Sequence, residues 1–135
     1  MSIKSCIPKD KHDLPATNRA KEMGFPALNE AIPELLEWVQ DANWPVAEPL
    51  ASVLQYAGAE IVPHVRNVLA GQDAEWKWAM IVLVIAQSSP EVISDLHDEL
   101  LRLAQDPSEL DTLAGVDAAA TEVLKEQMVQ SGIGK

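Results

Sequence analysis

The chain has 135 residues, of which 47% are hydrophobic and 23% are charged, a composition typical of a single globular domain. Its formal net charge is −11 at pH 7; a field of that sign repels phosphate backbones, so we expect no nucleic-acid partner. A single cysteine excludes an internal disulfide, and neither a signal peptide nor a bilayer-spanning apolar run is evident. We therefore expect a cytoplasmic protein without membrane contact.

The charge is divided unevenly along the chain. Residues 1–22 hold five Lys or Arg against three Asp or Glu, a net of +2, and the remainder holds five against eighteen, a net of −13, which together give −11. A body this acidic attracts basic partners. The alternative is that the acidic surface serves only solubility.

Helix caps, prolines and apolar spacing predict helices along the whole chain. Asp13 is a predicted cap of the first helix and Gly24 its end; Asn43 and Gly58 have the same roles for the third, and Asp73 is the predicted cap of the fifth. The fifth is apolar almost all round apart from Lys77, which predicts a central, buried position. The predicted helices cover residues 14–23, 32–39, 44–57, 60–70, 76–86, 90–103 and 111–130, with the start of the last left open by Gly115.

The pattern Asp-Ala-x-Trp occurs twice, at residues 41–44 and 73–76, and an Ile-Pro or Val-Pro step precedes each copy by a similar interval. A fixed period of this size is typical of repeat proteins in which each unit is one helix pair. The predicted fold is all-α: a short right-handed superhelix of three HEAT-like antiparallel helix pairs with an N-terminal capping helix. The predicted parts are a leader and cap over 1–31, repeats over 32–130 with pairs near 32–57, 60–87 and 90–130, and a frayed tail over 131–135.

Four segments also carry a resemblance to a known family. They are Ile7–Asp13, Leu35–Ala47, Ile61–Val65 and Trp76–Lys77, of which the Asn-Trp-Pro-Val-Ala element at 43–47 is the most specific. On these segments, from about residue 7 to 125, the chain resembles the bacterial domain of unknown function 5071 family. The resemblance implies a small HEAT-like helical domain and implies no catalytic residue.

The two Asp-Ala-x-Trp segments are the first candidate site. We expect each aspartate to accept hydrogen bonds from free amides of the following helix, with the tryptophan packed beneath the turn. In the alternative interpretation, Trp44, Trp76 and Trp78 line one concave groove together with acids. The candidate binding residues here are Asp41, Asn43, Trp44, Asp73, Trp76 and Lys77.

Two further candidates lie on predicted helix faces. His64 shares a face with Glu60 and Asn67, which is typical of solvated surface. Acids on the 90–103 helix form a stripe that could dock a basic protein or simply face solvent; the candidates are Glu91, Asp95 and Asp98. The Lys11-His12-Asp13 cluster offers too few ligands for a metal, so we expect a helix cap there. We predict no catalytic residue, metal or cofactor.

These observations favour a non-enzymatic module that binds a basic protein. One specific form is an immunity or antitoxin-like protein that neutralises a basic toxin. The alternative from another class is a small-molecule or enzymatic site in a tryptophan-lined groove, with Asp41, Asp73 or His64 as its polar groups. A stabilising accessory subunit is a third possibility, and the oligomeric state is left open.

Overall fold

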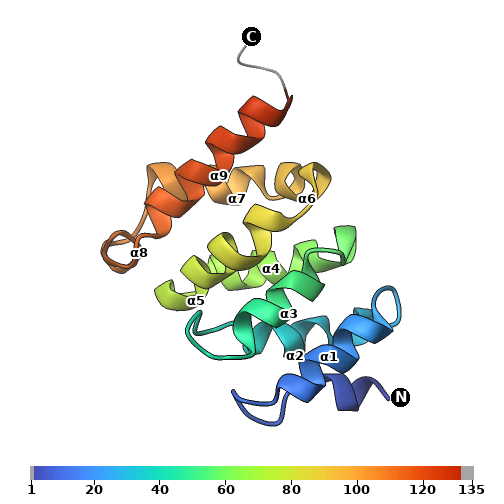
Figure 1. Cartoon of the computed structure of the whole chain (residues 1–135). Coiled ribbons are helices and arrows are strands. Elements are labelled where there is room, and N and C mark those ends of the chain that lie inside the picture. Colours follow the sequence, from blue (N-terminus) through green and yellow to red (C-terminus); the bar gives the residue numbers. More distant parts are fainter. Residues whose placement is uncertain (1, 132–135) are drawn as a thin grey trace.

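The computed structural model describes residues 2–131, with side chains up to residue 129, and this part of the chain consists of helices joined by turns and loops, with no strand. Figure 1 shows the helices stacked in chain order from the N-terminal end to the C-terminal end. The predicted all-α class is confirmed. The α-helices are α1 Leu14–Met23, α2 Ile32–Glu37, α3 Ala47–Leu54, α4 Val62–Ala70, α5 Ala74–Ala79, α6 Pro90–Asp95, α7 His97–Gln105, α8 Glu109–Ala114 and α9 Val116–Ser131.

Helix α1 begins and ends as the sequence predicts. The Asp13 carboxylate accepts hydrogen bonds from the amide of Lys9 at 3.0 Å and from that of Ala16 at 3.3 Å. The Lys9 bond is the main reason why the pKa of Asp13 lies below its ordinary value. Gly24 follows the helix with a φ of 63°, a conformation that favours glycine. The helix then packs against α3.

Helices α2 and α4 begin in the same way. A short 3-10 turn leads into each, Asn29–Ala31 before α2 and Gly58–Ile61 before α4. Each α-helix then has proline in its first turn, where no amide donor is required. The two helices pack against each other, and the Ile-Pro and Val-Pro steps lie at the same position of the two helix starts.

Helix α3 begins later than predicted. Asn43 does not cap it: the helix starts at Ala47, and the N-cap residue Val46 makes no side-chain hydrogen bond to it. The residues before it are held in turns instead, and the Val46 amide donates to the Lys11 carbonyl at 3.2 Å. The prediction that Gly58 ends this helix is also wrong, because α3 ends at Leu54 and Gly58 opens the next 3-10 turn.

The predicted central helix is continuous but changes its winding. It is α-helical over α5, π-helical over Met80–Val84 (η4) and 3-10 over Ile85–Gln87 (η5). Its core residues are fully buried against neighbours that include α3 and α9. These residues are Ala79, Met80, Ile81, Val84 and Ile85.

The two predicted C-terminal helices are each broken once. Leu96 leaves helical geometry and separates α6 from α7, and Gly115, with a φ of 84°, separates α8 from α9. Helices α7 and α9 then pack along each other. Of the tail predicted over 131–135, Ser131 is the last residue of α9 and the rest lies outside the described residues. None of the helices described has the length and apolar character needed to span a membrane.

Candidate functional site

The second Asp-Ala-x-Trp segment has the predicted structure. Asp73 is the N-cap of α5, and its Oδ1 accepts a hydrogen bond from the Trp76 amide at 3.1 Å. The Trp76 indole reaches back and donates from Nε1 to the Leu36 carbonyl, near the end of α2, at 3.1 Å. This segment therefore begins α5 and ties it to the end of α2, and its tryptophan has a structural role.

The first segment has the same pattern and a different structure. Asp41 accepts a hydrogen bond from the Asn43 amide at 2.8 Å, which closes a turn within the loop and caps no helix. Trp44 packs against Trp38, with the ring centroids 5.8 Å apart and the planes tilted by 54°. The loop is exposed at Asn43. This segment therefore presents polar groups to solvent, whereas the segment at 73–76 begins a helix.

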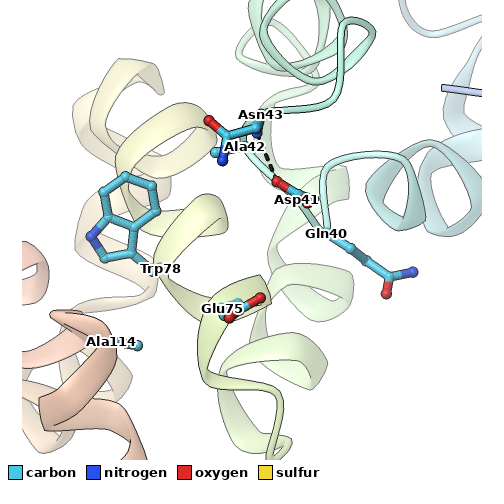
Figure 2. Close-up of a pocket in the computed structure, with 7 residues that line it drawn as sticks. All are labelled: Gln40, Asp41, Ala42, Asn43, Glu75, Trp78 and Ala114. Carbon is cyan, nitrogen blue, oxygen red and sulfur yellow. Dashed lines mark hydrogen bonds between the residues drawn. The ribbon is translucent and has the colours of Figure 1, made fainter. Parts of the chain in front are cut away.

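The loop of the first segment forms one side of a groove of about 430 Å³ (Figure 2). Figure 2 shows Asn43 and Trp78 on opposite sides of it, with Glu75 on the helix turn before Trp78. The groove residues, which we call the acidic groove, are Gln40, Asp41, Ala42, Asn43, Glu75, Trp78 and Ala114. Three separate segments thus supply two carboxylates, side-chain amides and an indole.

The acidic groove has no positive charge among the described residues that line it. The nearest basic residue in sequence, Lys77, points inward instead. Its Nζ lies 3.0 Å and 3.3 Å from the two carboxylate oxygens of Asp111, and both side chains are buried. Glu75 and Asp41 therefore keep their charges unpaired within residues 2–131, and the Trp78 Nε1–H makes no hydrogen bond there. The groove is suited to a cationic group.

The Lys77–Asp111 pair is held by a capping box. The Ser108 hydroxyl accepts from the Asp111 amide at 3.1 Å, and the Asp111 carboxylate accepts from the Ser108 amide at 3.3 Å. Burial raises the pKa of Asp111, but the hydrogen bonds from Lys77 and Ser108 outweigh it, so the pKa lies below its ordinary value. Asp111 is therefore a buried carboxylate that fixes α8 against α5.

The three tryptophans of the alternative groove do not converge. Trp76 and His64 share a small hollow of about 190 Å³ with residues of α2 and α4, and neither Trp44 nor Trp78 lines it. Ligand pockets generally measure about 300–1,000 Å³. Of the three, only Trp78 faces the acidic groove.

The acidic stripe is interrupted. Glu91 and Asp95 belong to α6, whereas Asp98 follows the break at Leu96 and belongs to α7; all three are exposed. Arg66 of α4 lies beside the stripe, where its Nε donates to Glu99 at 2.6 Å and a guanidinium nitrogen donates to the Asp95 carbonyl at 3.0 Å. Arg66 thus neutralises the neighbouring Glu99, whereas the carboxylates of Glu91, Asp95 and Asp98 make no ion pair within the described residues.

A larger hollow of about 530 Å³ lies between α1 and α3. Lys21, Phe25 and Tyr56 are among its lining residues, and no described residue that lines it is acidic. A basic partner would meet no counter-charge here, so the acidic groove remains the candidate site.

The sequence predicted this site only in part. Asp41 and Asn43 were among the candidates, but the groove also depends on Glu75, Trp78 and Ala114, which tertiary packing brings to the loop. Lys77, also a candidate, is structural. His12 is exposed next to the helix cap. Within residues 2–131, no cluster of three His, Cys, Asp or Glu side chains could hold a metal ion.

Comparison with known proteins assigns the chain to a family. The family model described as "Domain of unknown function (DUF5071)" matches residues 6–124. The match covers most of the chain, so the chain belongs to this family and the expected membership is confirmed. No curated protein shows significant similarity to it.

Proposed function

We propose that this member of the domain of unknown function 5071 family is a non-enzymatic module that binds a basic protein. The observation that carries the proposal is the acidic groove, which is lined by Asp41, Glu75 and the Trp78 indole and by no described basic residue. An arginine or lysine side chain fits this chemistry, because it can pair with the carboxylates while its cationic end lies over the ring of Trp78. The net charge of −11 would also speed encounter with such a partner.

The arrangement of the helices in this proposal is a short right-handed, HEAT-like superhelix. Support comes from the matching starts of α2 and α4, thirty residues apart in sequence, and from the stacking of successive helices in Figure 1. In such stacks, loops between helix pairs line one face and provide binding surface. The loop at residues 38–46 would have that role here.

One specific form of this function is immunity or antitoxin-like neutralisation of a basic toxin in the cytoplasm. The supporting features are the acidic surface and the small helical domain, so this form rests on analogy. It requires that the groove bind a cationic side chain, which can be tested directly.

The test uses hexaarginine as the probe and calorimetry as the measurement. Asp41→Asn combined with Glu75→Gln removes both groove charges, and the asparagine can still accept the Asn43 amide hydrogen bond. Each exposed ion pair contributes up to about 1 kcal/mol, so we expect the loss of both to weaken binding by up to about tenfold. Trp78→Leu should weaken binding without changing the charge.

The matched control is Asp95→Asn combined with Asp98→Asn. It also raises the net charge of −11 by two, but in the stripe rather than the groove. The proposal expects near wild-type binding from this control. Equal losses in the two double variants would show that hexaarginine responds to the total charge only, and the groove would not be the site.

A further inference from the structure

Helix α8 has the reverse of the usual polarity. Its aspartate is buried, with Asp111 only 3% exposed. Its two leucines lie at the surface, with Leu110 63% exposed and Leu113 77% exposed. Burial of apolar surface normally drives leucines inward. An exposed apolar pair on an acidic domain therefore indicates a surface that another molecule covers.

The orientation of α8 is fixed by the contacts of Asp111. The carboxylate is held by Lys77 from α5 and by the amide of Ser108. Rotation of the helix to bury Leu110 and Leu113 would break this buried pair and leave Lys77 without its partner. The leucines are thus held outward by the same contacts that keep Lys77 out of the acidic groove.

The two leucines adjoin the acidic groove. Leu110 and Leu113 line a hollow of about 340 Å³ together with Asp73, Glu75 and Ala114, and the last two also line the acidic groove. Apolar and acidic groups therefore form one continuous surface, which we call the α8 surface: Leu110, Leu113 and the acidic groove. Figure 2 shows Ala114, from α8, at the edge of the groove near Trp78.

We propose that the α8 surface docks a segment of a partner protein that carries apolar side chains next to lysine or arginine. This inference rests on the proposed function and specifies the partner. The leucines would take the apolar side chains, and Glu75 and Asp41 the basic ones. A second copy of this chain is disfavoured, because it would bring Asp73, Glu75 and exposed Glu109 against the same acids.

The test compares two synthetic peptides of equal positive charge. One is a helical peptide with leucines on one face and lysines on the other, and the second has serine in place of each leucine. The protein variants are Leu110→Ser combined with Leu113→Ser, and Tyr56→Ser as a control at another residue that is 74% exposed. Leu110, Leu113 and Tyr56 are all exposed, so circular dichroism should report unchanged folding.

We expect the leucine peptide to bind the wild-type protein about tenfold more tightly than the serine peptide. The Leu110→Ser/Leu113→Ser variant should lose that preference, and Tyr56→Ser should keep it. Equal binding of the two peptides, or a preference that survives the leucine substitutions, would overturn the inference.

Failure of the inference can be told apart from failure of the proposed function. If the leucine substitutions change nothing while Asp41→Asn/Glu75→Gln weakens both peptides, the groove binds basic groups and the α8 docking model is wrong. If neither double variant has an effect, both proposals are wrong. Light scattering tests for a second copy as the occupant. A wild-type dimer that becomes a monomer after the leucine substitutions would also overturn the inference.

Discussion

The two Asp-Ala-x-Trp segments have the same sequence pattern and different structures. In the segment at 73–76, the aspartate caps α5 and the tryptophan donates to the Leu36 carbonyl. In the segment at 41–44, the aspartate closes a loop turn and Trp44 packs on Trp38. The segment at 73–76 therefore connects helices, and the segment at 41–44 exposes polar groups beside the acidic groove.

The two segments also differ in the residues that follow the tryptophan. Lys77 and Trp78 continue α5, whereas the corresponding Pro45 and Val46 precede α3. Lys77 is buried against Asp111, and Trp78 lines the acidic groove. The segment at 73–76 therefore leads into the buried pair and one wall of the groove, and the segment at 41–44 supplies residues of the other wall.

The largest expected effect comes from the Lys77–Asp111 pair, which has no counterpart in the first segment. Asp111→Ala leaves the Lys77 ammonium buried without its partner. Lys77→Ala leaves the Asp111 carboxylate buried without its partner. Either change should lower the free energy of unfolding by about 3–5 kcal/mol. Urea denaturation measures this value.

The control for this prediction replaces both partners. Lys77→Met combined with Asp111→Leu removes the two charges together, and stability near or above the wild-type value is expected. Single variants as stable as the wild type would contradict the buried pair.

The same pair makes stability depend on pH. The pKa of Asp111 is lowered in the folded state, chiefly because the hydrogen bond from Lys77, with that from Ser108, outweighs the opposing effect of burial. Its contribution is therefore complete above the unfolded pKa, about 3.9, and is lost as the pH falls through the lower folded value. Between pH 5 and pH 2, roughly, the wild type should lose more stability than Asp111→Asn. Parallel losses in both proteins would contradict the assignment.

The tryptophans provide the next comparison. Trp76→Phe removes the indole donor, but the Leu36 carbonyl keeps the Val39 amide as a donor, so the loss of one hydrogen bond should cost about 0.5–1.5 kcal/mol. Trp44→Phe keeps an aromatic ring against Trp38 and should cost less than about 1 kcal/mol. The thermal midpoints of the two variants test this order, and a reversed order would show that the segments have been assigned the wrong roles.

The aspartates should show the smallest difference. Asp73→Ala removes a helix cap and should cost about 1 kcal/mol. Asp41→Ala removes only a turn bond in a loop, and a change within about 0.5 kcal/mol is expected. Chemical denaturation of both variants measures the two values, and equal costs would mean that Asp41 stabilises more than its own turn.

Local signals predicted much of the fold. Asp13 and Asp73 accept hydrogen bonds from amides within a few residues, and Gly24 ends α1 through its own backbone conformation, so their roles could be inferred from the chain alone. Asn43 could not be interpreted in this way, because a tertiary bond from the Val46 amide to Lys11 and the ring contact with Trp38 hold its loop outside the helix.

The candidate site was harder to predict because its residues meet only in three dimensions. Asp41 and Ala114 are far apart in sequence but line one groove. Lys77 and Asp111 are separated by 34 residues, and nothing in the local pattern shows that they pair. In α8, the ion pair with Lys77 buries Asp111, and Leu110 and Leu113 are left exposed.

The most direct test of the account is the response of the four tryptophan indole N–H signals to hexaarginine in NMR spectra of the labelled protein. Trp→Phe variants would assign the signals. The Trp78 signal should move farthest, because its indole lines the acidic groove, and the Trp76 signal should stay in place, because it is bonded to Leu36. Binding that leaves the Trp78 signal unmoved, or shifts all four equally, would contradict the acidic groove as the binding site.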